Sequence, residues 1–140
     1  MEKKREVSVL IPYKIQTDGI FVYLQKREKD RKTLPGHFAF FGGGVEEGET
    51  PIQTLEREIQ EELCFTPKGY EFLGKYDFSW LANVYFLKVD DTFEKGIKVM
   101  EGDYGKFFSE TEVANEPMMI DEDKSILKDL YKILAKKIHE

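Results

Sequence analysis

Apolar and polar positions alternate along much of the chain in the pattern that predicts β-strands separated by turns. A tight turn at 17–19 would join the first two strands into a hairpin. The run at 80–89 is apolar on both faces, which indicates a strand in the interior of a sheet. A short aromatic strand would end at three consecutive glycines, residues 42–44. The strands are expected at 7–11, 20–24, 37–41, 70–78, 80–89 and 105–109.

Two segments predict helices instead. Thr50 suits an N-cap, Pro51 suits the first helical position, and Gln53 completes a capping box. This helix should run to about Leu63. A second helix should begin at about Asp121, because acids open the segment, lysines close it and apolar residues recur at helical spacing. Those apolar residues are Ile126, Leu127, Leu130, Tyr131, Leu134 and Ile138. Strands combined with these helices predict an α/β fold.

Length and composition predict one soluble domain over residues 1–140, with 41% apolar and 34% charged residues. The net charge of −6 provides no basic surface for a nucleic acid polymer or an anionic membrane. No run approaches the roughly 18 apolar residues of a membrane span, and the first residues lack the pattern of a signal peptide. Cys64 is the only cysteine, which excludes an internal disulfide and fits a reducing compartment. We expect a cytoplasmic monomer or homodimer.

Three carboxylates in the first predicted helix form a candidate metal-binding site. Glu58, Glu61 and Glu62 stand at i, i+3 and i+4, so they project from one arc of about 100°. Like charges at this spacing destabilise a helix by roughly 0.2–0.5 kcal/mol, whereas Mg²⁺ prefers oxygen ligands and binds beside phosphates. A solvated acidic face is the alternative. The glycines before the helix favour a site, because bare backbone lets a phosphate or metal approach closely. The neighbouring arc carries Ile52, Leu55, Ile59 and Leu63.

The stretch from Gly43 to Phe65 resembles the box of the Nudix hydrolase family. That box runs Gly, five residues, Glu, seven residues, Arg-Glu, an aliphatic residue, any residue, Glu-Glu, any residue, Gly and a hydrophobic residue. Only the final Gly fails here, where Cys64 stands. The positions in register are Gly43, Glu49, Arg57, Glu58, Ile59, Glu61, Glu62 and Phe65.

The resemblance covers most of the chain and is closest to the MutT-like branch. It implies an α/β/α sandwich with a mixed central sheet and a C-terminal helix. It also implies a metal-dependent pyrophosphohydrolase that cleaves a phosphoanhydride bond of a nucleoside triphosphate or related nucleoside diphosphate derivative, a small-molecule substrate. Hydrolysis of a nucleotide sugar or dinucleoside polyphosphate is an alternative, because the box recognises only the diphosphate and metal. A ligand sensor without catalysis is another, although the box glutamates are all present.

Carried over to this chain, the resemblance assigns Glu58, Glu61 and Glu62 as ligands of Mg²⁺ or Mn²⁺. One of them would also serve as the base that activates water. Arg57 would pair with Glu49 and tie the loop to the helix. Gly42 would offer its backbone carbonyl to the metal, and Gly43 would lie against the substrate.

Outside the box the resemblance marks three further places. The pair Lys26–Arg27 would touch phosphate, with Arg27 the stronger candidate, unless both are solvated loop charges. Glu101 would bring a further metal-binding or water-activating carboxylate, and Asp103 and Glu112 compete for that role. Asn115 would meet a purine base, unless it belongs to a plain turn. The apolar slot for that base would come from Phe38, Phe40, Phe78 or Trp80.

Two departures from the family pattern carry expectations of their own. Cys64 replaces a glycine that ends the helix in a left-handed conformation, which costs a non-glycine residue about 1 kcal/mol. Local strain or a different helix exit should follow. Phe41 stands where the family often has proline before the glycines, which leaves the shape of the base pocket open.

Overall fold

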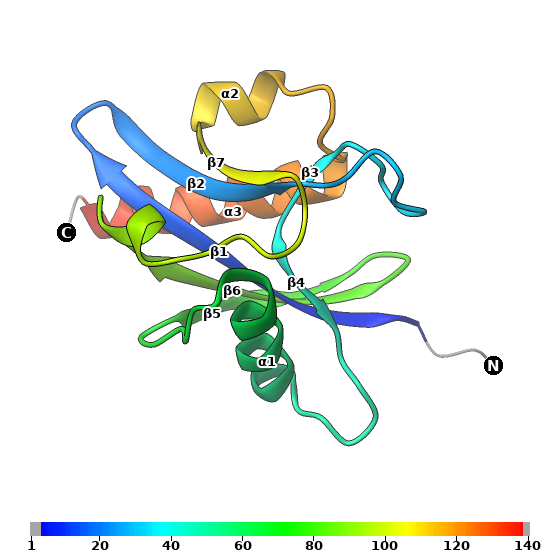
Figure 1. Ribbon diagram of the computed structural model, residues 1–140. Helices are drawn as coiled ribbons and strands as arrows, with labels where there is room; N and C mark the ends of the chain where they lie inside the picture. Colours follow the sequence, from blue (N-terminus) through cyan, green and yellow to red (C-terminus); the bar gives the residue numbers. More distant parts are fainter. Residues whose placement is uncertain (1–3, 139–140) are drawn as a thin grey trace.

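In the computed structural model, which describes residues 4–138, seven strands form one mixed sheet (Figure 1). The strand order is β3-β2-β1-β6-β5, with β4 paired to β1 and β7 paired to β2. The strands are β1 Glu6–Gln16, β2 Gly19–Lys26, β3 Phe38–Ala39, β4 Phe41–Gly44, β5 Glu71–Asp77, β6 Leu81–Lys88 and β7 Tyr104–Ser109. The six strands predicted from the pattern are therefore found, with one of them divided in two.

Strand β1 organises the sheet because both of its edges are paired. It runs parallel to β6 along one edge, from the Glu6–Leu81 pair to the Tyr13–Lys88 pair. Along the other edge its first half is antiparallel to β4 and its second half antiparallel to β2. The predicted hairpin is confirmed, and β6, which lies between β1 and β5, is the interior strand that its apolar run predicted.

The expectation that the glycines end an aromatic strand was wrong. β3 pairs with β2, and Phe40 separates it from β4, where the glycines themselves pair with β1. The reason is close packing: a Cβ on Gly42 would lie 2.1 Å from the Ser8 carbonyl oxygen, and Gly42 has φ +143°. Glycine here permits a strand contact that a side chain would block.

The two predicted helices are present as α1 Pro51–Leu63 and α3 Asp121–Ile138. Thr50 and Gln53 form the predicted capping box of α1. The structure adds a short helix α2, Glu110–Asn115, and a 3₁₀ turn, η1 Phe93–Lys95. No helix between residues 4 and 138 combines the length and apolar content that crossing a bilayer requires.

The sheet is covered on both faces. Successive residues of β1 point to opposite sides, so Leu10 packs in one core with Leu55 and Ile59 of α1, while Ile11 packs in the other with Leu127 of α3. In Figure 1, α1 and α3 lie on opposite sides of the strands. The expected α/β/α sandwich with a mixed sheet and C-terminal helix is confirmed.

One residue of the apolar arc of α1 departs from expectation. Ile52 is 46% exposed, whereas Leu55, Ile59 and Leu63 are fully buried. The buried apolar face of α1 is therefore shorter than its sequence pattern predicted. It runs along the same part of the helix that carries the carboxylates.

Of the two outcomes expected at Cys64, local strain or a different helix exit, the structure has the first: the exit of α1 is left-handed at a non-glycine residue. Cys64 has φ 51° and ψ 42°, is exposed, and its N–H donates to the Gln60 carbonyl at 3.0 Å. We expect Cys64→Gly to raise the free energy of unfolding by about 1 kcal/mol, since glycine adopts this conformation without a Cβ clash. Urea denaturation measures this.

The control for this prediction is Cys64→Ala, which removes the thiol but keeps the Cβ. It should leave stability close to that of the wild type, and neither variant should alter kcat. Equal stabilities for the glycine and alanine variants would show that the left-handed backbone at residue 64 carries no cost.

Candidate active site

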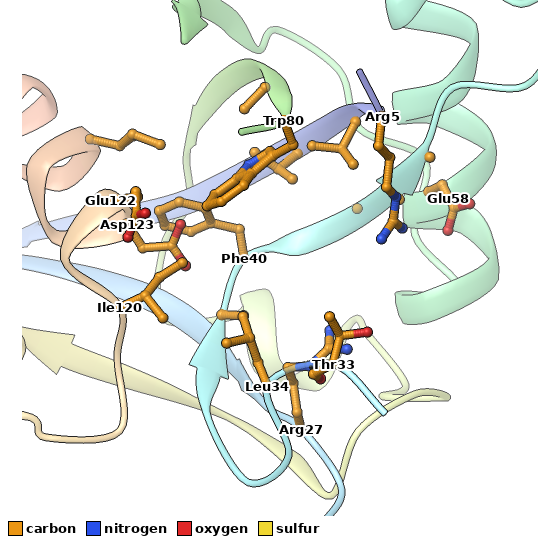
Figure 2. Close-up of a pocket in the computed structure, with 18 of the residues that line it drawn as sticks. Arg5, Arg27, Thr33, Leu34, Phe40, Glu58, Trp80, Ile120, Glu122 and Asp123 are labelled. Carbon is orange, nitrogen blue, oxygen red and sulfur yellow. Dashed lines mark hydrogen bonds between the residues drawn. The ribbon is translucent and has the colours of Figure 1, made fainter. Parts of the chain in front are cut away.

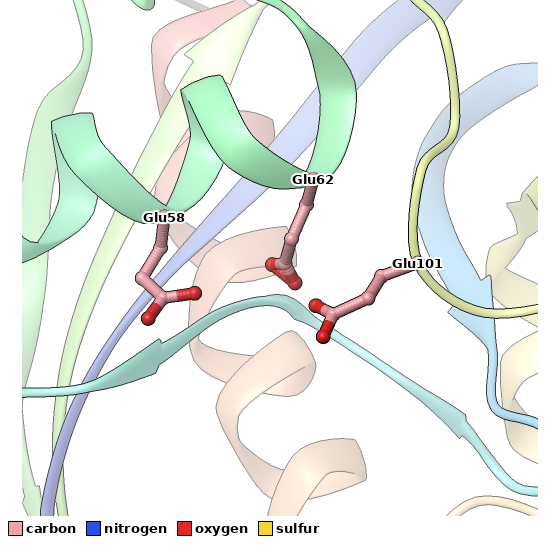
Figure 3. Close-up of side chains that lie close together, drawn as sticks. All are labelled: Glu58, Glu62 and Glu101. Carbon is pink, nitrogen blue, oxygen red and sulfur yellow. The ribbon is translucent and has the colours of Figure 1, made fainter.

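Two carboxylates of α1 meet a third from a distant part of the chain. Glu58, Glu62 and Glu101 each place one oxygen within 4.8 Å of the others (Figure 3). Glu58 and Glu62 are one helical turn apart. The segment that carries Glu101 is tied to α1 by the Met100 N–H, which donates to the Glu62 carbonyl at 2.7 Å, and to β2 by the Gln25 side chain, which donates to the Glu101 carbonyl at 3.1 Å.

Glu62 is the most buried member of the cluster, at 2% exposure. Its carboxylate accepts the Gly42 N–H at 2.9 Å, yet burial still raises the pKa of Glu62 to about 9. Burial also raises the pKa of Glu58, against the opposing charge of Arg57. The charges of Glu58 and Glu101 add to the shift at Glu62. In the free protein the surroundings therefore disfavour the ionised forms of Glu58 and Glu62. A bound cation would stabilise those ionised forms.

Glu61 lies outside this cluster, which corrects the expectation that all three helix carboxylates share one face. Its side chain is 59% exposed, and the nearest cation is Arg57, whose Nη1 lies 3.6 Å from Glu61 Oε2. Adjacent helix positions differ by about 100°, so turning Glu62 toward the sheet turns Glu61 toward solvent. The role of Glu61 as a metal ligand stays a prediction.

Arg57 links the loop before α1 to the cluster. Its Nε and Nη2 donate to the two oxygens of Glu49 at 2.7 and 3.0 Å, which confirms the predicted partnership. This hydrogen bonding lowers the pKa of Glu49 to about 2. Arg57 Nη1 also donates to Glu58 Oε1 at 2.9 Å. One guanidinium therefore fixes the loop and orients a cluster carboxylate together.

Gly43 lies directly against the cluster. A Cβ at this position would fall 2.4–2.6 Å from the carboxylate atoms of Glu58. The missing side chain is thus what allows Glu58 to lie over β4. The expected metal contact of the Gly42 carbonyl stays a prediction, since the contact that the structure gives Gly42 is its N–H to Glu62.

Two of the three cluster carboxylates border a cavity of about 720 Å³. Figure 2 shows Arg5 and Glu58 on one side and Trp80, Phe40, Ile120 and Asp123 on the other, with Arg27 below them beside Leu34. Glu58 and Glu101 both line this cavity, as do three arginines: Arg5, Arg27 and Arg31. One end of the cavity thus combines arginines with carboxylates, and the other combines apolar side chains with two acids, Glu122 and Asp123.

The predicted basic pair divides between two environments. Arg27 lines the cavity, and its Nε donates to the Thr33 carbonyl at 3.0 Å. Lys26 turns away, donates to the Gly36 carbonyl at 2.6 Å and lies over the Phe38 ring. Sequence reasoning missed Arg5 and Arg31, because an arginine before a strand and another in a charged loop carry no periodic signal.

Several expected site residues are placed elsewhere. Asn115 ends α2, is exposed, and donates to the Thr111 carbonyl at 3.1 Å, so the structure does not bring it to the cavity. The cause is the capping box of Ser109 and Glu112, which starts a helix where a base-reading segment was expected. Glu112 is occupied by that cap, and Asp103 is exposed beyond Glu101.

The aromatic candidates also divide. Phe40 and Trp80 line the cavity and Phe38 and Phe78 do not, although all four pack in or against the core under α3. Phe41 is fully buried and stacks on Tyr23 on the α1 side of the sheet. Phe41, which replaces the family's usual proline, therefore packs in the core, and its neighbour Phe40 lines the cavity instead.

A sandwich of this topology, with a carboxylate-bearing helix after a glycine-rich strand, defines a Nudix-type domain. Residues 3–130 match the NUDIX domain, and the chain belongs to this family. A curated relative, the nucleoside triphosphatase NudI of Escherichia coli O139:H28 (strain E24377A / ETEC), is 46% identical over 59 residues. That match covers 42% of this chain and only 40% of the relative's length.

Solved structures share the fold at lower identity. A mutT/nudix family protein from Listeria innocua superimposes with a TM-score of 0.80 and 21% identity, covering 99% of this chain and 98% of the other. The NUDIX domain of Shewanella oneidensis NrtR, crystallised with ADP ribose, superimposes with a TM-score of 0.77 and 14% identity. That match covers 96% of this chain and 90% of the other. At these identities the likeness establishes the fold.

Proposed function

We propose that the protein is a metal-dependent hydrolase that cleaves a phosphoanhydride bond of a nucleoside triphosphate or a related nucleoside diphosphate derivative. The observation that carries the proposal is the cluster of Glu58, Glu62 and Glu101, because Glu58 and Glu101 line a cavity of about 720 Å³ together with three arginines. Carboxylates alone would repel a polyphosphate, so the cluster serves such a substrate only with a cation between them. The partial match to NudI, whose name is nucleoside triphosphatase, supports this substrate class.

The residues present fit Mg²⁺ or Mn²⁺. Three carboxylate oxygens within 4.8 Å form a hard donor set, and the absence of a side chain on Gly43 leaves Glu58 against the strand. Glu61 and the Gly42 carbonyl are further candidate ligands. When bound, such a cation lowers the pKa of coordinated water and polarises phosphoryl oxygens.

The chain's own groups supply binding and proton transfer. Arg5, Arg27 and Arg31 are positioned to hold phosphate oxygens. Arg57 keeps Glu58 oriented. Glu101 reaches the cluster from a loop with its side chain 49% exposed, which suits a group that accepts a proton from water; Glu58 is the second candidate for this role.

The experiment incubates the purified protein with nucleoside triphosphates, nucleotide sugars and dinucleoside polyphosphates, with and without Mg²⁺, and identifies the products. We expect a nucleoside monophosphate and pyrophosphate from a triphosphate, with one water consumed. The rate should fall to background in excess chelator, recover with Mg²⁺ or Mn²⁺, and rise toward alkaline pH.

Two outcomes would contradict this proposal. Full turnover in excess chelator would exclude the metal mechanism. Tight nucleotide binding with no product from any substrate would favour the ligand sensor. Products from nucleotide sugars or dinucleoside polyphosphates alone would keep the chemistry and move the substrate class to that alternative.

A further inference from the structure

A second cavity, of about 780 Å³, is lined by residues of α2 and α3 alone. It shares no lining residue with the cavity that Glu58 borders. We call this second cavity the helix groove. The carboxylate cluster and the arginines of the proposed hydrolase site lie outside it, so any ligand of the helix groove binds at a separate place on the molecule.

One face of α3 lines the helix groove with lysines. Lys124, Lys128 and Lys132 are spaced i, i+4 and i+8, so their side chains project from one side of the helix. Lys124 Nζ donates to the Ala114 carbonyl at 3.2 Å, which ties α3 to α2. In the part of the chain that the structure describes, Lys128 and Lys132 have neither a hydrogen bond nor an ion pair. Two exposed ammonium groups are therefore available to a ligand.

Tyr131 places a buried hydroxyl on the same face of α3. The residue is 8% exposed, and within residues 4–138 its hydroxyl has no hydrogen-bond partner. Burial raises the pKa of Tyr131 and the charge of Glu110 adds to the rise, so the hydroxyl keeps its proton. Glu110 lines the helix groove from α2, and its action on the hydroxyl indicates that the hydroxyl lies on the groove side of the ring. A buried hydroxyl without a partner costs free energy, which a ligand that accepts its hydrogen bond recovers.

The side chains beside this hydroxyl can move. Lys128 lies one helical turn before Tyr131, where the side chain of a helical tyrosine extends, and Lys132 directly follows it. Both lysines are exposed, and exposed side chains change rotamer within nanoseconds. A ligand that draws the two ammonium groups toward itself therefore gains access to the hydroxyl.

The α2 wall of the helix groove is largely apolar. Val113 is 3% exposed and Ala114 adds a methyl group, while the methylene stems of the lysines extend the apolar surface on α3. Two acids, Glu110 and Asp121, also line the groove, and they oppose an anion without outnumbering the three lysines. The groove is therefore suited to a ligand with an apolar body and an anionic group at one end.

We propose that the helix groove binds a small organic anion, an aryl or alkyl group that carries a phosphate or a carboxylate. The anionic group accepts the hydrogen bond of the Tyr131 hydroxyl and lies between the ammonium groups of Lys128 and Lys132. The apolar body packs against Val113. The site is separate from the hydrolase site, so this proposal does not depend on the proposed function.

The first experiment locates the binding by NMR on isotope-labelled protein. Amide shifts of Val113 and Lys128 report on the helix groove, and that of Gly43 reports on the cavity beside the cluster. Phenyl phosphate and benzoate should move the groove amides with roughly 10-fold higher affinity than benzyl alcohol, which lacks the charge, or inorganic phosphate, which lacks the apolar body. The tighter of the two anions identifies the anionic group. Shifts at Gly43 alone would overturn the proposal.

The second experiment changes the hydroxyl. Tyr131→Phe keeps the ring and removes a buried group that has no partner, so it should not lower the melting temperature. It should weaken the binding of the tighter anion by roughly 10-fold, the scale for losing a hydrogen bond to a charged group. Lost binding in a protein that is no less stable separates a ligand contact from a structural role. Equal affinity in Tyr131→Phe and wild type would overturn the proposal.

The third experiment determines the sign of the ligand's charge. The double variant Lys128→Gln, Lys132→Gln should weaken anion binding by roughly 5-fold or more. Glu110→Gln should strengthen it, because this change removes a negative charge from the groove. Lys136→Gln is the matched control, since Lys136 lies one turn beyond Lys132 on α3 and does not line the groove. Weaker binding in Glu110→Gln, or equal losses in the double variant and the control, would overturn the proposal.

Discussion

Glu62→Gln is expected to lower kcat by roughly 100-fold or more, the scale for loss of a charged group that stabilises the reacting phosphoryl group, while raising the stability of the metal-free protein. Glutamine keeps the shape of the side chain and an oxygen that can accept the Gly42 N–H. It removes the buried negative charge that a cation would need. Loss of activity together with gained stability distinguishes a ligand from a residue that merely supports the fold.

The stability gain should depend on pH. The pKa of Glu62 is about 9 in the fold, above its ordinary value of 4.5, so folding favours the protonated form. The stability that this carboxyl contributes is fully present below about pH 4.5 and is lost as pH rises toward 9, at up to roughly 1.4 kcal/mol for each pH unit. The melting temperature of Glu62→Gln should therefore match wild type near pH 5 and exceed it increasingly toward pH 9.

The matched control is Glu61→Gln, which removes a neighbouring charge from the exposed side of the same helix. It should show no such pH-dependent stability gain and a smaller loss of kcat. Added Mg²⁺ should raise the melting temperature of wild type and of Glu61→Gln, but not of Glu62→Gln. Equal losses of activity in the two variants would restore the sequence expectation that Glu61 is a ligand of the same rank.

The carboxylates on α1 could be predicted because a motif in fixed register lies within one helix, where spacing determines direction. The sequence could not predict which of these carboxylates enter the cluster, because the burial of Glu62 depends on β4 lying under α1. Glu101 could be proposed only by resemblance. Its position depends on the backbone contact from Met100 to α1, which joins segments far apart in sequence.

The end of the cavity away from the cluster was the least predictable part. Asn115 was favoured because an amide can both donate and accept, yet a local capping box places it on a short helix outside the cavity. Asp123 looked like an ordinary acid at a helix start, where carboxylates favour the dipole. Its burial follows from the packing of α3 against the sheet, which one helix pattern does not reveal.

Adjacent glycines of β4 should fail in different ways when changed to alanine. A Cβ on Gly42 would meet backbone atoms of β1, the Ser8 carbonyl at 2.1 Å and the Val9 Cα at 2.7 Å, at a φ of +143°. Backbone cannot move aside cheaply, so Gly42→Ala should cost more than about 3 kcal/mol of stability. Its melting temperature should fall by about 10 °C or more.

Gly43→Ala should instead spare the fold and damage catalysis. Its Cβ would meet only the Glu58 carboxylate, at 2.4–2.6 Å, and that flexible side chain can swing away at little cost to folding. Displacing a cluster carboxylate by about 1 Å can cost roughly 100-fold in rate, so we expect kcat to fall by about 10- to 100-fold. Gly44→Ala is the control, since its Cβ would meet nothing closer than 3.9 Å. Thermal denaturation and kcat measured on all three variants test the predictions for Gly42→Ala and Gly43→Ala. A Gly43→Ala protein with normal kcat would show that the position of Glu58 over β4 is not required for the reaction.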